Sequence, residues 1–228
     1  SQVAVSTLTS LPSLLFVWDH RLDRNGQLAP LAPEAGFRLE ASAAFAEPWL
    51  LGQDEFIKLS AAASKFFAIG RNLTLRGDLR YDQGIPLGGA ALLPEVERFF
   101  AGGDTTVRGY EDDRLATEIV RVGVPPIAGL SQIRVIPSGG NIRTLASVDA
   151  QLRIYKILAG ALFSDAGLIT NQWASVTLDS IRPSVGTGLR LLTPFGILAV
   201  EYAVPLRPHL GDDPRGRLHF YFAARAQF

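Results

Sequence analysis

One arginine of the chain lies in a stretch whose glycines would hold it in a fixed position. Arg108 falls within Phe99–Tyr110, which reads FFAGGDTTVRGY. Gly102 and Gly103 can adopt backbone angles that are closed to other residues, and Gly109 follows the arginine directly. A guanidinium held in this way can form a bidentate contact with a carboxylate. A solvated surface loop would not need such a constraint, so we predict a function for this stretch.

Enzyme chemistry has little support elsewhere in the sequence. The three histidines, His20, His209 and His219, are scattered and have no partner at H-x-x-x-H spacing. We find no Gly-x-Ser-x-Gly elbow and no phosphate-binding loop. The absence of cysteine excludes thiolate chemistry and a disulfide framework. We therefore expect no enzyme, no catalytic residue, no metal and no cofactor.

Composition narrows the class of protein further. Lysine and arginine together equal aspartate and glutamate at 22 each, and no basic stripe is present, which argues against nucleic acid as a partner. Apolar residues make up 47% of the chain, yet no run approaches the ~18 apolar residues of a membrane helix. No signal peptide or methionine is present, so we expect a mature product or a fragment.

Apolar and polar residues alternate along nine segments, which is the pattern of β-strands with one apolar face. A membrane barrel strand needs ~9–11 such residues, whereas strands of soluble sandwiches are usually about 5–6 residues long. The predicted strands are Leu14–Leu22, Gly36–Phe45, Phe56–Ile69, Leu73–Tyr81, Ala146–Tyr155, Ala159–Leu168, Ser184–Leu191, Ile197–Leu206 and Leu218–Phe228. Residues 1–11 are a weaker candidate for a tenth strand.

The segment Leu73–Tyr81 shows the alternation most clearly. One face carries leucines and a tyrosine, and the other carries Arg76, Asp78 and Arg80. A soluble sandwich could expose these charges to water, but a barrel would direct them into its lumen, where opposite charges can pair. On the segment before it, Lys65 interrupts the apolar face and is expected to snorkel from hydrocarbon to water.

A long region rich in glycine and proline, residues 85–141, separates four predicted strands from five. Loops of more than ~12–15 residues without regular structure are uncommon and are usually functional. This one contains Phe99–Tyr110. Beyond it, a tight turn at residues 193–196 predicts that Arg190 and Glu201 face each other across a hairpin on the polar side.

Two motifs in order resemble those of a known superfamily. The stretch around Arg108 is similar to the F-x-G-G-x-x-x-V-R-G-[FY] signature of the BamA, TamA and two-partner-secretion transporters and insertases of the outer membrane. Downstream, Phe163-Ser164-Asp165-Ala166-Gly167 matches the F-x-D-x-G motif of the same superfamily. The pattern of Asp19, Arg21, Pro33 and Gly36 also resembles a strand pair of these proteins, so the resemblance covers nearly the whole chain. The form FFAGGDxxVRGY favours a TamA-like member.

The resemblance implies an all-β, antiparallel transmembrane barrel of sixteen strands, of which residues 1–228 form the C-terminal nine or ten: four within 14–84 and five within 142–228. It implies that the loop folds into the lumen, where Arg108 meets Asp165 on the wall. Loop motif residues would be Gly102, Gly103, Val107, Gly109 and Tyr110, and wall motif residues Phe163 and Gly167. The aromatic final strand, with Phe220, Phe222 and Phe228, resembles the sorting signal of outer-membrane barrels.

The implied function is the insertion or translocation of β-rich client proteins at the bacterial outer membrane, without ATP, through a seam between the first and last strands. An organelle outer membrane is a less favoured location. Implied partners are membrane lipid, client proteins and a periplasm-spanning partner reached through N-terminal POTRA domains. Three alternatives stay open: a two-partner secretion pore for one adhesin or haemolysin, a passive anchor for an enzyme domain such as a patatin-like lipase, and a soluble β-sandwich with Arg108 solvated.

Overall fold

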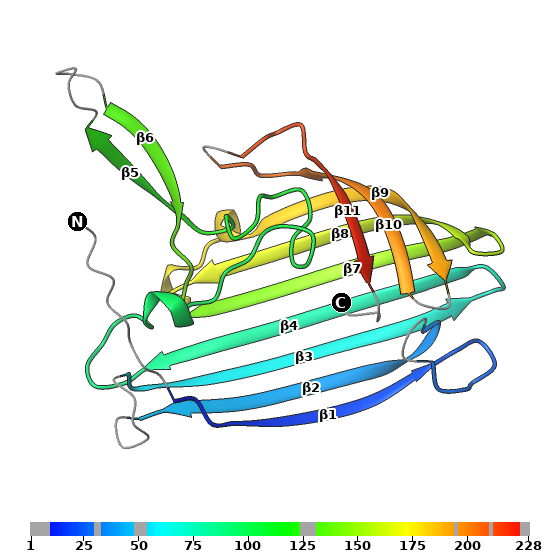
Figure 1. Ribbon diagram of the computed structural model, residues 1–228, viewed down its shortest axis with the longest axis horizontal. Helices are drawn as coiled ribbons and strands as arrows, with labels where there is room; N and C mark the ends of the chain where they lie inside the picture. Colours follow the sequence, from blue (N-terminus) through cyan, green and yellow to red (C-terminus); the bar gives the residue numbers. More distant parts are fainter. Residues whose placement is uncertain are drawn as a thin grey trace.

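The structure is a computed structural model that describes residues 10–29, 33–47, 54–123, 131–193, 196–209 and 212–223 of the 228-residue chain. Its main strands are β1 (Ser13–Leu22), β2 (Ala35–Ala46), β3 (Phe56–Ile69), β4 (Leu73–Pro86), β7 (Ile142–Tyr155), β8 (Leu158–Thr170), β9 (Arg182–Thr193), β10 (Gly196–Pro205) and β11 (Arg217–Ala223). All nine pair antiparallel in this order in a single sheet. The sheet curls so that β9, β10 and β11 bend over its concave side (Figure 1). The predicted antiparallel barrel architecture is confirmed, and two face-to-face sheets are excluded for the described residues.

The two faces of this sheet are the reverse of what a water-soluble protein shows. On the convex face, Val148 and Leu162 are 61% and 65% exposed. On the concave face, Asp82, Asp149 and Asp165 are at most 2% exposed. Apolar side chains point out and charged side chains point in, as expected where the outside is lipid and the inside is a polar lumen.

The connections between strands differ in length at the two ends of the sheet. At one end, residues 70–72 join β3 to β4 and residues 156–157 join β7 to β8, while the connection between β1 and β2 at this end, residues 23–34, is longer. At the other end, residues 87–141 join β4 to β7 and residues 171–181 join β8 to β9, the latter with short 3-10 helices at Trp173–Ser175 and Leu178–Ser180. We call these the short-turn end and the long-loop end. Short turns on one side and longer loops on the other are typical of bacterial outer-membrane barrels.

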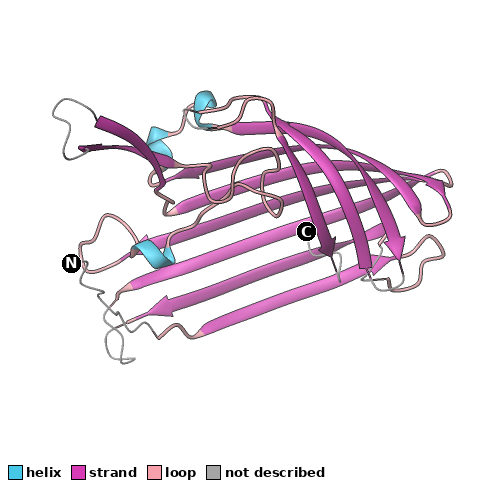
Figure 2. Ribbon diagram, turned by 45° about the horizontal axis from the view of Figure 1, so that its top comes forward, coloured by secondary structure: helices cyan, strands magenta, loops and turns pink. Residues whose placement is uncertain are grey.

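The region 87–141 differs from its prediction as a loop without regular structure. It contains a 3-10 helix at Glu95–Glu97 and a separate hairpin of β5 (Thr117–Gly123) and β6 (Ser131–Pro137). This hairpin projects beyond the long-loop end of the sheet (Figure 1). The part before it, including Phe99–Tyr110, returns into the concave side of the sheet (Figure 2). None of the helices in the described part of the chain is long and apolar enough to cross a membrane.

Candidate functional site: the loop and the barrel wall

The returning loop is a tight structure whose glycines are required by its geometry. Gly102 and Gly103 have φ angles of +121° and +87°, which favour glycine. A Cβ at Gly102 would collide with the carbonyl oxygen of Glu111, and the Gly103 N–H donates to the Tyr110 carbonyl at 3.2 Å. The two ends of the motif are therefore folded onto each other, and Arg108 lies near the tip of this fold.

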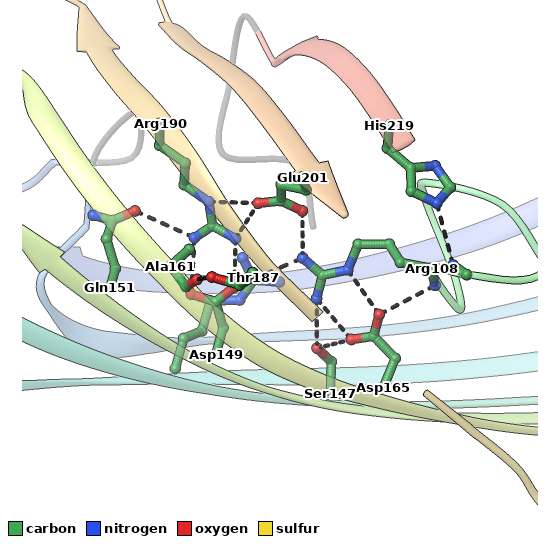
Figure 3. A network of polar contacts seen from close by, with 12 residues as sticks. Arg108, Ser147, Asp149, Gln151, Ala161, Asp165, Thr187, Arg190, Glu201 and His219 are labelled. Carbon is green, nitrogen blue, oxygen red and sulfur yellow. Dashed lines mark hydrogen bonds and ion pairs between the residues drawn. The ribbon is translucent and has the colours of Figure 1, made fainter. Parts of the chain in front are cut away.

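Arg108 reaches the wall at Asp165, on β8 (Figure 3). Arg108 Nε and Nη2 donate to the two carboxylate oxygens of Asp165, each at 2.7 Å, and the backbone N–H of Arg108 lies 3.2 Å from Oδ2. Ser147 Oγ donates to the same carboxylate at 2.6 Å. Arg108 is 6% exposed and Asp165 1%. A buried, bidentate pair of this kind fixes both the position and the orientation of the guanidinium.

A second arginine extends this contact into a network that the sequence motifs did not reveal. Arg108 Nη1 also donates to Glu201, on β10, at 2.8 Å. Glu201 accepts from Arg190 Nε of β9 at 2.7 Å, and Arg190 Nη1 donates to Asp149 of β7 at 2.8 Å. All these charged groups are buried. Glu201 thus lies between two guanidinium groups, and one network joins the loop to four neighbouring strands, β7 to β10.

Burial and the carboxylates act in opposite directions on Arg108. Burial alone would lower the pKa of its guanidinium, but the hydrogen bonds and charges of Asp165 and Glu201 outweigh burial and raise this pKa above its ordinary value. Arg108 is therefore a permanent cation in the site.

Arg190 and Glu201 do contact each other, although not as direct cross-strand partners. The register pairs Arg190 with Ala199 and Glu201 with Gly188, so the two side chains meet diagonally. A side chain at Gly188 would overlap Glu201. The absence of a side chain there leaves the space that Glu201 occupies.

The other two residues of the wall motif also serve the loop. The guanidinium carbon of Arg108 lies 3.4 Å from the centre of the Phe163 ring, which forms a floor under the cation. A Cβ at Gly167 would overlap Val107 and Leu115 of the loop. Phe163, Asp165 and Gly167 are two residues apart and lie on the concave face of β8. Phe163 packs against the guanidinium, Asp165 pairs with it, and Gly167 leaves space for the loop.

The predicted loop residues beside Arg108 pack against the wall rather than into solvent. Val107 and Tyr110 are 0% and 1% exposed, in an apolar cluster with Ala101 and Leu115. The Tyr110 hydroxyl lies 3.1 Å from the Pro183 carbonyl and 3.2 Å from that of Arg207. Burial raises the pKa of this hydroxyl, so it stays protonated and can donate a hydrogen bond to these carbonyls.

Two contacts connect the loop to the last strand, and neither was predicted. The Gly109 N–H donates to His219 Nε2 at 3.2 Å, and Glu111 pairs with Arg217 at 2.7 Å. His219 therefore acts as a neutral acceptor on β11. Gly109 has φ +94°, and a Cβ there would lie 3.2 Å from the backbone of Ala203 on β10. Position 109 is restricted to glycine by its backbone angle and by this close approach.

A cavity of about 360 Å³ lies between the loop and the wall strands. It is lined by loop residues Asp104 and Thr105 and by charged side chains of β2 and β4 that include Arg38 and Asp78. Such a volume is large enough for several water molecules, and its charged lining is typical of a barrel lumen. Among the described residues, no three His, Asp or Glu side chains come together as a metal site.

The aromatic residues of the predicted sorting strand lie on the convex face of β11. Phe220 and Phe222 are 67% and 55% exposed there. Phe228 lies outside the described residues, as do residues 1–9, where a tenth strand was considered.

A curled antiparallel sheet with an apolar outside, a charged inside and a loop fixed in its lumen defines a transmembrane β-barrel protein with an internal plug. The chain belongs to the Omp85 superfamily, since the model of the Omp85 superfamily domain matches residues 7–225. It is accordingly an integral protein of the bacterial outer membrane.

A solved structure has the same fold. BamA from Haemophilus ducreyi lacking POTRA domains 1–3 superposes with a TM-score of 0.61 at 17% sequence identity, over 83% of this chain and 38% of the BamA chain. The chain thus spans well under half of that protein. In outer-membrane barrels the short turns face the periplasm, so the loop enters the lumen from outside the cell.

Proposed function

We propose that this chain is the C-terminal part of a sixteen-stranded barrel that inserts or translocates β-rich client proteins, in the manner of TamA or BamA. Membership of the Omp85 superfamily and the BamA-like fold support this proposal. We also propose that the full-length protein has N-terminal POTRA domains, through which it reaches a periplasmic partner, and that its clients are β-rich proteins. The proposed function does not involve active-site chemistry; pairing of β-strands drives the assembly of the client.

The observation that carries the proposal is that, among the described residues, the buried ion pairs that hold the loop lie on β7 to β10 and leave β11 with weaker contacts to the loop. β11 is an edge of the described sheet, and its links to the loop are one neutral hydrogen bond and one half-exposed ion pair. The buried charges that hold the loop are on β7 to β10. An edge strand with free backbone groups is a template to which another strand can pair.

Photo-crosslinking during client assembly tests this role. A photoreactive amino acid replaces Phe220 on β11, Leu79 on β4 or Ser64 on the lumen face of β3, in the full-length protein embedded in lipid vesicles. Phe220 and Leu79 are similarly exposed on the convex face, at 67% and 56%, so Leu79 is the matched control. An unfolded outer-membrane barrel protein is then added. We expect crosslinks from Phe220 and not from Leu79, together with faster folding of the client.

Other outcomes would support the alternatives. A secretion pore would crosslink its substrate from Ser64, which lines the lumen cavity, and not from Phe220. A passive anchor would give no crosslink from any of the three positions and would leave the folding rate unchanged. Either result would overturn the insertase proposal.

A further inference from the structure

Two basic side chains on the convex face remain unexplained by the plug. The sheet register aligns His20 of β1, Phe37 of β2, Lys65 of β3 and Gly77 of β4 in one row. Lys65 Nζ lies 5.5 Å from the centre of the Phe37 ring and 5.4 Å from that of Phe67. On the other side of Phe37, the His20 ring lies at 5.7 Å. Aromatic rings thus hold two basic side chains, Lys65 and His20, in one cluster on the lipid-facing side of the sheet.

Lys65 and His20 differ from the charged residues on the concave face of the same strands in their ion pairing. Asp19 pairs with Arg21, Arg38 with Glu40 and Arg76 with Asp78, and these pairs lie on the concave face. Within the described ranges, neither Lys65 nor His20 forms an ion pair with a carboxylate. Their contacts with rings attract a cation but do not neutralise it. The charge of Lys65 therefore lacks an anionic partner among the residues that the structure describes.

The position of the cluster along the barrel indicates which anion is available. Lys65 is four residues from the end of β3, about 13 Å along the strand at ~3.3 Å per residue. Because barrel strands tilt by about 40°, this is roughly 10 Å above the short turns. The long side chain can extend from there to the lipid headgroups. Trp18, whose ring packs edge-on against Phe37 at 5.2 Å, adds an aromatic residue of the kind found at membrane interfaces.

The surface next to Lys65 is open. A Cβ at Gly77 would meet no atom within 4 Å, although the next residue in the row, Val148, is a protruding apolar side chain. The row therefore has a shallow gap between Lys65 and Val148. A lipid can occupy this gap with its acyl chain and place its headgroup beside the lysine.

We propose that Lys65 and His20, which are held on either side of Phe37 and flanked by Trp18 and Phe67, bind the phosphate of an anionic phospholipid in the periplasmic leaflet. The Lys65 ammonium pairs with the phosphate, and the His20 ring offers a second donor. A phospholipid is the source because the cluster faces lipid, and an anionic lipid is preferred because a zwitterionic headgroup already carries its own cation. This inference depends on the membrane location of the barrel and not on the proposed insertase function.

Quenching of Trp18 fluorescence by brominated lipids tests the site. These 228 residues contain three tryptophans, so replacing Trp49, Trp173 and any tryptophan elsewhere in the full-length protein by phenylalanine leaves Trp18 as the only emitter. The full-length protein is placed in phosphatidylcholine vesicles that contain a minor share of brominated phosphatidylglycerol or brominated phosphatidylcholine. We expect phosphatidylglycerol to bind beside Trp18 about fivefold more strongly, as one basic residue near a membrane surface provides.

The variant Lys65→Gln should remove this preference. Lys156→Gln is the matched control, because Lys156 lies at the same end of the barrel and also sits over one ring, Tyr155 at 5.2 Å, but outside the cluster. It should keep the fivefold preference. Equal quenching by both lipids in the parent protein, or an unchanged preference in K65Q, would overturn the proposal. Displacement of the brominated phosphatidylglycerol by inorganic phosphate in the buffer would show that the anion comes from solution and would also overturn it.

Discussion

Replacing Asp165 by asparagine tests how strongly the wall holds the loop. The change keeps the size of the side chain but removes its charge. In the parent protein Asp165 accepts two 2.7 Å bonds from the Arg108 side chain, one from the Arg108 backbone and one from Ser147. An asparagine keeps one acceptor oxygen and presents an amide N–H₂ to the guanidinium, so one of the two strong bonds is lost and the other now joins the cation to a neutral acceptor.

The expected cost follows from the contacts that remain. Breaking a buried ion pair outright costs about 3–5 kcal/mol, because the surviving charge is left without a partner. Here Glu201 still binds Arg108 at 2.8 Å, and Asp149 lies 3.8 Å away. A hydrogen bond to a charged group contributes about 1.5–3 kcal/mol. We therefore expect D165N to weaken docking of the loop by about 2–3 kcal/mol, which corresponds to about a 30-fold to 150-fold larger undocked fraction.

Trypsin provides the assay, because the bond after Arg108 can be cleaved only when this buried arginine leaves the wall. When opening is fast relative to cleavage, the cleavage rate follows the undocked population. Mass spectrometry of the protein in detergent micelles would give the rate for this bond, with the exposed Arg215 bond as an internal standard. D78N is the control variant, since Asp78 pairs with Arg76 and Ser64 on the wall and not with the loop. An unchanged rate in D165N, or an equal increase in D78N, would refute the reasoning.

Exchanging the two charges, R108D with D165R, is expected to restore docking only in part. A simple pair would be fully restored by the exchange. In the structure, however, Glu201 lies next to position 108, so an aspartate there would face a second carboxylate. Trypsin does not cleave after the aspartate at position 108 of this variant. A protease that cleaves after acidic residues would therefore be used to measure docking.

Three further predictions use the same cleavage measurement. G109A should increase cleavage after Arg108 about tenfold or more, because a left-handed backbone costs a residue with a Cβ about 1–2 kcal/mol and the Cβ would press on Ala203. G26A is the control: Gly26 has φ +80° and no atom within 4 Å of an added Cβ, so this variant should have no effect on the loop. Because burial raises the pKa of Tyr110, its contribution to docking is complete below about pH 10 and is lost as the pH rises through the raised pKa; proteinase K cleavage of the loop should increase there, and Y110F should lack this alkaline step. H219F should increase cleavage about fivefold, since it removes the acceptor of one neutral hydrogen bond worth about 1 kcal/mol, whereas H219Q should keep most of the protection.

Alternation of apolar and polar residues was sufficient to locate the nine strands of the sheet, but not all of their ends. It placed Phe56–Ile69 with the bounds that the structure has. It ended the next strand at Tyr81, ahead of the region rich in glycine and proline that was predicted to begin at residue 85. In the structure β4 continues to Pro86, which pairs with Phe56. A full-length neighbouring strand offers hydrogen-bond partners, and this outweighs the local preference of a glycine near a strand end.

The hairpin of β5 and β6 was missed for a related reason. Its two strands have seven residues each, and the sequence between and around them is rich in glycine and proline. Short strands that pair only with each other leave a weak pattern, since they do not follow the long alternation of the barrel wall. The prediction of a loop without regular structure was therefore wrong for residues 117–123 and 131–137.

The site shows where sequence motifs stop being informative. Two motifs bring Arg108 and Asp165 to attention because their neighbours have fixed spacing along the chain. Alternation also placed Arg190 and Glu201 on the polar face. That these residues join Arg108 depends on the curvature of the sheet, which carries β9 and β10 over the loop (Figure 2). The signal that could have been used is the pair of small residues at Gly186 and Gly188, which leave space for Phe163 and Glu201.

The charge balance of the wall explains why the loop returns to it. Asp149, Asp165 and Glu201 are three buried carboxylates, and among the described residues the buried arginine of the wall that pairs with two of them, Asp149 and Glu201, is Arg190. A buried carboxylate without a partner is costly, so this part of the wall needs a second cation, and Arg108 provides it. Because Glu201 is shared by both arginines, loss of Arg108 disturbs the contacts of Arg190 as well. Partial withdrawal of the loop therefore leaves several groups unsatisfied at once, and the loop is expected to dock or leave as a single unit.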